Sequence, residues 1–81
     1  MSWIERDGAL HLEIRTKNFI DAFERVQAIV GPAEQLNHHP DIAFGWGYLR
    51  IKLTTHDAGG VTEKDRRLAV LIDEALVRFC D

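Results

Sequence analysis

The sequence holds little that would tie it to an oxidising compartment, a membrane or a nucleic acid. Its 81 residues include one cysteine, Cys80, which has no partner for an internal disulfide, so we expect a protein of the reducing cytoplasm. The first residues lack the cationic start and apolar run of a signal peptide, and no apolar run is long enough to span a membrane. With a net charge of −3 and no basic cluster larger than Arg66-Arg67, we expect no nucleic-acid binding.

The composition is that of one small folded domain over residues 1–81. The hydrophobic fraction of 46% is ordinary for a globular protein and argues against disorder. A chain of this length lies near the lower limit for an independent hydrophobic core. Oligomerisation, which buries further surface, would therefore add stability.

Alternating apolar and polar residues predict two pairs of strands. Asp7-Gly8 is a turn signal between a short strand near Ile4 and a strand over 9–15. The stretches 41–44 and 48–55 predict the second pair, with a turn or bulge at 45–47. The order strand-strand-helix-strand-strand-helix predicts an α+β two-layer sandwich, in which a four-stranded antiparallel sheet carries its helices on one face.

Helical spacing of apolar residues predicts a helix after a cap at Thr16 or Asn18, and a second helix capped at Thr62 with Asp65 in the capping-box position. Gly31-Pro32 should interrupt or kink the first helix, because proline lacks the N–H donor and clashes with the preceding turn. We expect 33–36 to form a last turn and 37–40 an extended exit. Val70 and Val77 lie off the apolar stripe of the second helix and are interpreted as partner-facing.

Three of the four histidines lie in two short segments, Asn37-His38-His39-Pro40 and Thr54-Thr55-His56-Asp57. Imidazoles titrate near neutrality, with a pKa of ~6.5, and two of them could supply an acid and a base without metal or cofactor. Zinc is disfavoured, because adjacent residues in extended backbone project to opposite sides and no cysteine pair supplements them. From spacing alone, structural or merely exposed histidines explain the pattern better than a catalytic pair does.

His11, on the polar side of a predicted strand, is expected to have no catalytic role. For the other polar and aromatic candidates a structural role stands beside a functional one. Glu34 could orient an imidazole or bind substrate, or be a solvated helix-end carboxylate. Thr62 and Asp65 could serve only to cap a helix, and Thr54 and Thr55 could be ordinary strand residues. Trp3 and Trp46 could be half-buried aromatic side chains. Gly59-Gly60 is better explained as a plain turn than as an anion site.

Taken together, these segments resemble the pterin-4a-carbinolamine dehydratase family. The resemblance rests on Glu34-x-x-Asn37-His38-His39-Pro40, Trp46, Thr54-Thr55-His56-Asp57 and Gly59-Gly60-Val61-Thr62-x-x-Asp65, with Trp3 and Phe19-x-x-Ala22-Phe23 upstream. It extends from about Trp3 to Ala75, nearly the whole chain. The N-H-H-P element followed by T-H-D-x-G-G is specific to that family.

The resemblance implies a hydro-lyase, 4a-hydroxytetrahydrobiopterin dehydratase, which works without a cofactor in tetrahydrobiopterin recycling. It implies that His38 and His56 form the acid/base pair, in an undecided order, and that Glu34 belongs to the catalytic motif. His39 would fix the pterin. The positions that match the lining of the family's pocket are Trp3, Thr54, Thr55 and Asp65.

The resemblance also implies a homodimer formed by joining sheets edge to edge, and in some members a tetramer formed through helices. The family usually carries a helix before the tryptophan that matches Trp3, and we expect that helix to be missing here. The alternative function is a non-catalytic binding protein, because some relatives act as Rubisco assembly factors of carboxysomes or as dimerisation cofactors of a transcription factor. A hydroxylase is a further possible partner.

Overall fold

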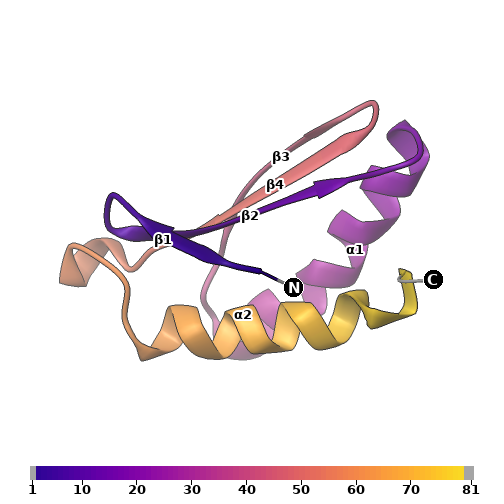
Figure 1. Cartoon of the computed structure of the whole chain (residues 1–81). Coiled ribbons are helices and arrows are strands. Elements are labelled where there is room, and N and C mark those ends of the chain that lie inside the picture. The colour runs from indigo at the N-terminus through magenta and orange to yellow at the C-terminus, as the bar shows by residue number, and fades with distance from the viewer. Residues whose placement is uncertain (1, 80–81) are drawn as a thin grey trace.

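The computed structural model describes residues 2–79, which form a sheet covered on one face by two helices (Figure 1). The strands are β1 (Ile4–Arg6), β2 (Ala9–Arg15), β3 (Asp41–Gly45) and β4 (Tyr48–Leu53), and the helices are α1 (Phe19–Leu36) and α2 (Glu63–Leu76). The sheet order is β1-β2-β4-β3, and every neighbouring pair is antiparallel. The predicted α+β two-layer sandwich is confirmed.

Both hairpins turn over two residues. Asp7 and Gly8 have φ values of 53° and 76°, the two positive angles that a type I′ turn requires, so the predicted β1–β2 turn is confirmed. The β3–β4 turn consists of Trp46 and Gly47, and Gly45 pairs with Tyr48 as the last rung of the ladder. These short turns fix the register of all four strands.

The hydrophobic core lies between the sheet and the two helices. In β4, Leu49, Ile51 and Leu53 are buried while the residues between them are exposed, which is the predicted alternation. The remaining large core side chains come from β2, α1 and α2, namely Leu10, Leu12, Ile29, Leu68, Ile72 and Leu76. Because α2 supplies three of them, its packing closes the core.

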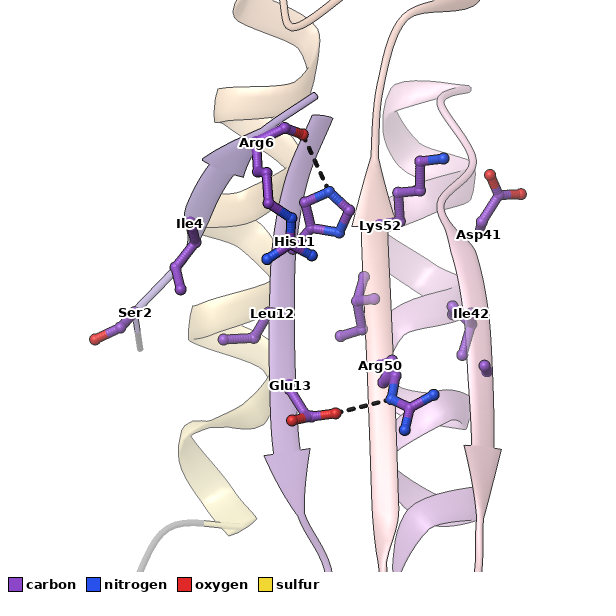
Figure 2. Close-up of a pocket in the computed structure, with 12 residues that line it drawn as sticks. Ser2, Ile4, Arg6, His11, Leu12, Glu13, Asp41, Ile42, Arg50 and Lys52 are labelled. Carbon is purple, nitrogen blue, oxygen red and sulfur yellow. Dashed lines mark hydrogen bonds and ion pairs between the residues drawn. The ribbon is translucent and has the colours of Figure 1, made fainter. Parts of the chain in front are cut away.

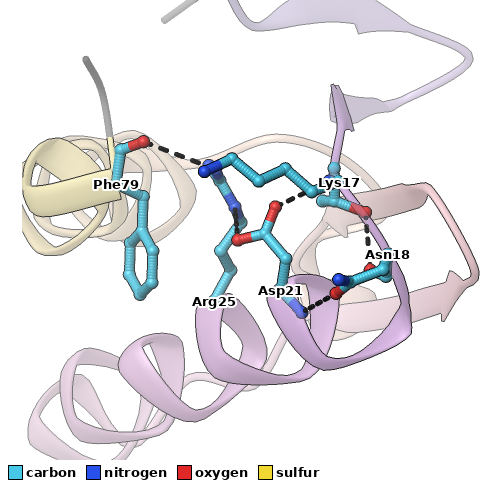
Figure 3. Close-up of polar contacts among 6 residues, drawn as sticks. Lys17, Asn18, Asp21, Arg25 and Phe79 are labelled. Atoms are coloured by element: carbon cyan, nitrogen blue, oxygen red, sulfur yellow. Dashed lines mark hydrogen bonds and ion pairs between the residues drawn. The ribbon is translucent and has the colours of Figure 1, made fainter.

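The start of α1 is held by Asp21 as well as by its cap. Asn18 is the N-cap residue, and its Oδ1 accepts the N–H of Asp21 at 2.8 Å. The Asp21 carboxylate accepts the Lys17 N–H at 2.8 Å and Arg25 Nε at 3.3 Å, and Arg25 also donates to the Phe79 carbonyl at 3.4 Å (Figure 3). The Lys17 hydrogen bond is the main cause that lowers the pKa of Asp21. These contacts tie the first turn of α1 to the segment after α2.

The predicted interruption at Gly31-Pro32 is wrong, because α1 continues through both residues as one helix. Pro32 deprives one backbone carbonyl of its N–H partner. Ile29 and Ala33, on either side of it, are buried against the rest of the domain. Breaking the helix would expose both side chains, so the packing outweighs the one lost hydrogen bond.

The two valines that the sequence singled out lie on α2 and just after it. Val70 is exposed on α2, and Val77 is exposed in the short 3-10 helix Val77–Phe79 that follows it. Their partner-facing role stays a prediction. Across residues 2–79, neither helix is long and apolar enough to cross a membrane.

Candidate functional site

Three element ends meet at the candidate site: the exit of α1, the end of β4 and the start of α2. Asn37 closes α1 in the left-handed conformation (φ 50°, ψ 43°), and its N–H bonds to the carbonyls of Ala33 and Glu34. The extended exit therefore begins at His38, one residue later than predicted. The His38 N–H also bonds to the Ala33 carbonyl, at 3.0 Å. This cap anchors the backbone from which the His38 ring reaches α2.

The buried carboxylate of Asp65 connects the three element ends. Its side chain has no solvent exposure. Oδ1 lies 2.6 Å from Nε2 of His38, whose own side chain is only 12% exposed. Oδ2 accepts the hydroxyl of Thr55 and the backbone N–H of Thr62, both at 2.8 Å. The predicted capping box of Thr62 and Asp65 is confirmed, and the same aspartate also binds His38.

The pKa of Asp65 lies below its ordinary value of 3.8. Burial by itself raises this pKa, because a charged carboxylate loses its hydration. Hydrogen bonds from His38, the Thr62 N–H and Thr55 favour the charged form and together more than offset the burial. Asp65 is therefore ionised at neutral pH.

An ionised Asp65 sets the tautomer of His38. The carboxylate can only accept a hydrogen bond, so Nε2 of His38 must carry a proton and donate it. In the neutral ring Nδ1 then keeps a lone pair and can accept a proton. A carboxylate that orients an imidazole in this way is a recurring device for making histidine a general base.

His39 points away from this network and pairs with Glu34. Its Nε2 lies 2.6 Å from Glu34 Oε2, and the two side chains are 57% and 67% exposed. Adjacent His38 and His39 thus project to different sides, as their extended backbone predicts. Glu34, one turn before His38 in the sequence, contacts His39 instead. Within residues 2–79, no group of three or more His, Cys, Asp or Glu side chains is arranged to hold a metal ion.

His56 begins the short 3-10 helix His56–Ala58 just after β4. Strand β4 ends at Leu53, two residues earlier than predicted, and the chain is then held by backbone hydrogen bonds between Thr55 and Gly60. The His56 ring is exposed and makes no hydrogen bond or ion pair with the side chains of residues 2–79. Its neighbour Thr55 belongs to the Asp65 network, which fixes the backbone at this point.

The other two predicted pocket residues bond outside the Asp65 network. The Thr54 hydroxyl donates to the Gly8 carbonyl in the β1–β2 turn at 2.8 Å. Trp3 Nε1 donates to Asp73 Oδ1 on α2 at 2.9 Å, and the indole packs against the core. Their substrate-binding role stays a prediction.

The sequence assigned Thr62 a cap and nothing more, yet its hydroxyl lies 2.8 Å from the hydroxyl of Thr55. Seven residues separate the two threonines across a loop. Spacing alone does not reveal such a contact.

A separate hollow of about 690 Å³ lies on the open face of the sheet, opposite the helices (Figure 2). His11 and Lys52 line it, together with the ion pair of Arg50 and Glu13, whose Nε and Oε2 lie 2.8 Å apart. None of the residues predicted to act on substrate lines this hollow. It is therefore distinct from the site at the three element ends.

Comparison with known sequences agrees with the motif. The family model described as "Pterin 4 alpha carbinolamine dehydratase" matches residues 1–75. A Picosynechococcus sp. protein is 43% identical over 72 residues, which cover 89% of this chain and 78% of that protein. A protein of Mycobacterium sp. (strain KMS) is 42% identical over 76 residues, which cover 94% of this chain and 81% of that protein. Both carry the name "Putative pterin-4-alpha-carbinolamine dehydratase".

Two solved structures share the fold. A transcriptional coactivator/pterin dehydratase from Brucella melitensis superposes with a TM-score of 0.81 at 29% identity, over 90% of this chain and 80% of that one. A pterin dehydratase-like protein described as a RuBisCO assembly factor in the alpha-carboxysome superposes with a TM-score of 0.76 at 22% identity, over 95% of this chain and 92% of that one. This likeness shows the fold alone. From the family model and the identity of its relatives, the chain belongs to the pterin-4a-carbinolamine dehydratase family.

Proposed function

We propose that this protein dehydrates 4a-hydroxytetrahydropterin to quinonoid dihydropterin and water, as a cytoplasmic step of tetrahydrobiopterin recycling that uses no cofactor. The observation that carries the proposal is His38, held at 2.6 Å by the buried carboxylate of Asp65 within the family's motif.

The reaction needs one proton delivered and one removed. The C4a–O bond breaks as the hydroxyl takes a proton and leaves as water, while N5 loses its proton and the C4a=N5 double bond forms. His38, with its tautomer set by Asp65, accepts the N5 proton at Nδ1. His56, exposed and bound to no carboxylate in residues 2–79, delivers the proton to the hydroxyl. Such general acid–base assistance contributes roughly 10²–10⁴-fold to the rate.

We propose further that the exposed pair of His39 and Glu34 holds the pterin. Pterin rings present amide and amine N–H groups that a carboxylate accepts, and a ring nitrogen and carbonyl to which an imidazole donates. Because both side chains are more than half exposed, they can turn from each other to the substrate. Thr54, Thr55 and Trp3 complete the pocket in this proposal.

The test is the dehydration rate of synthetic 4a-hydroxytetrahydropterin with the wild type, His38→Ala, His56→Ala and His11→Ala. We expect the first two variants to lose roughly 10²–10⁴-fold in kcat, and His11→Ala to match the wild type. A wild type no faster than buffer would contradict the enzymatic proposal. Full activity in both His38→Ala and His56→Ala would contradict the roles assigned to these histidines.

Binding of a protein partner is the second candidate function. The Brucella relative carries the double description of transcriptional coactivator and pterin dehydratase. Here Phe19 and Phe23 are exposed and stack or tilt against Phe44, with ring centroids 5.3 and 6.4 Å apart. Exposed aromatic clusters are common in protein interfaces. A double variant, His38→Ala with His56→Ala, separates the functions, because it would abolish dehydration and leave a partner complex intact.

A further inference from the structure

The hydroxyl of Thr62 makes a contact with the site that its position as the cap of α2 does not require. Thr55 Oγ1 lies 2.8 Å from Asp65 Oδ2 and 2.8 Å from Thr62 Oγ1. A hydroxyl has one proton, and an ionised carboxylate has none to give. The proton of Thr55 therefore points to Asp65, and Thr62 must be the donor to Thr55.

The donor and the acceptor of each side-chain hydrogen bond that links Thr62, Thr55, Asp65 and His38 are thus determined. Thr62 donates to Thr55, Thr55 donates to Asp65, and His38 donates to the other oxygen of the same carboxylate. The two threonines are half-buried and Asp65 is fully buried, so little water competes for these bonds. Among residues 2–79, no buried side-chain polar atom lacks a partner.

Removing the Thr62 hydroxyl would remove the first donor in this series of hydrogen bonds. Thr55 would lose the donor that fixes its oxygen, and its own proton could rotate away from Asp65. The backbone N–H of Thr62 would still reach Asp65, so the change isolates the hydroxyl. The Asp65 carboxylate would then be held less firmly in place, because one of its three donors is no longer fixed. His38 would spend part of its time without the hydrogen bond to Asp65, and during that time either ring nitrogen can carry the proton.

We propose that Thr62 is a positioning residue, whose hydroxyl acts through Thr55 and Asp65 to hold His38 with its proton on Nε2. The kinetic consequence rests on the proposed dehydratase function. The structural consequence, the tautomer of His38, does not.

The experiment compares Thr62→Val, Thr62→Gly and Thr62→Ser. Serine keeps both the cap and the donor, whereas glycine is a tolerated N-cap without a hydroxyl and valine matches the shape of threonine. Asn18→Ala is the matched control, since it removes the cap of α1 at a helix end outside the Asp65 network. The readouts are the two imidazole ¹⁵N shifts of His38, which report its tautomer, and kcat and KM for 4a-hydroxytetrahydropterin.

We expect Thr62→Val and Thr62→Gly to bring the two ¹⁵N shifts closer together, as a mixture of tautomers does. The loss of one hydrogen bond should lower kcat about fivefold, with little change in KM. Thr62→Ser should match the wild type, and Asn18→Ala should lower the unfolding midpoint without changing either readout.

Wild-type ¹⁵N shifts in Thr62→Val and Thr62→Gly would overturn the proposal, and so would an equal shift in Asn18→Ala, which would reveal general destabilisation. A lower kcat without a change of tautomer would overturn it too. If the wild type lacks dehydratase activity but Thr62→Val still shifts His38, the proposed function fails and the positioning role stands.

Discussion

At the scale of single residues, Asp65 combines two tasks in one carboxylate. It accepts the N–H of Thr62 at the first turn of α2 and orients His38 from the end of α1. Asp65→Asn keeps the size of the side chain but puts an N–H₂ group where a donor already points. We expect it to lower the free energy of unfolding by about 1–3 kcal/mol, measured by urea denaturation at neutral pH. An unchanged midpoint would show that the buried network contributes no stability.

The lowered pKa of Asp65 also predicts how stability depends on pH. The unfolded chain protonates this group near 3.8, the folded protein only at lower pH. Between those two values the unfolded state holds more protons, so stability rises with pH. The contribution of Asp65 to the free energy of unfolding is fully present above its pKa in the unfolded chain. It is lost as the pH falls through its pKa in the folded protein. Urea midpoints from about pH 2 to 5 should rise less steeply in Asp65→Asn than in the wild type.

Asp21 is the control for this pH experiment, because its pKa is lowered as well. Asp21→Asn should remove a separate part of the slope while leaving His38 untouched. If the slope of the urea midpoint against pH matches the wild type in both variants, neither carboxylate governs how stability falls at acid pH.

At the scale of elements, α1 contains a glycine, Gly31, directly before Pro32. Apart from its two chain neighbours and the nearby backbone of α1, a Cβ at Gly31 would meet nothing within 4 Å, and its φ is not positive. Gly31→Ala should raise the free energy of unfolding by less than about 1 kcal/mol, measured by urea denaturation, because contact between the new Cβ and Pro32 offsets part of the gain in helix propensity.

Gly59 is the matched control, because a Cβ there also meets nothing within 4 Å but φ is +73°. Gly59→Ala should destabilise by about 1–2 kcal/mol, the cost of the left-handed conformation for an L-residue with a side chain. If Gly31→Ala is instead destabilising, the contact of the new Cβ with Pro32 outweighs the gain in helix propensity.

Local patterns account for most of the elements but for few of the contacts in the site. Alternation gave the strands, and the three-residue spacing of Thr62 and Asp65 gave the cap of α2. The Gly31-Pro32 break failed because burial of Ile29 and Ala33 outweighs the local preference of proline. The link from His38 to Asp65 spans 27 residues and depends on how α1 and α2 pack, which no local pattern contains. The contact of Glu34 with His39, by contrast, is local, and the sequence allowed Glu34 to orient an imidazole without saying which histidine it would reach.

At the scale of the whole molecule, the sheet has two edges of unequal length. β1 has three residues, whereas β3 has five, of which only Asp41 is charged. A long edge with few charges favours pairing with another strand. We therefore propose that the shared-sheet dimer forms through β3.

The wild type should sediment as a dimer at micromolar concentration. Ala43→Lys places a cation on the exposed face of β3, and in a twofold dimer two such charges would approach each other, so this variant should be monomeric. Ile4→Lys, the equivalent change on exposed β1, should remain dimeric. A wild-type monomer would count against the dimer, and a monomeric Ile4→Lys would move the contact to the other edge.

The hydrogen bond between Trp3 and Asp73 joins residues that lie 70 positions apart. α2 contributes Leu68, Ile72 and Leu76 to the core, so part of the sheet's apolar face stays uncovered until α2 forms. During synthesis, the chain through Leu76 must leave the ribosome before this face can be fully covered. The domain therefore acquires its native structure only once α2 is available, rather than segment by segment.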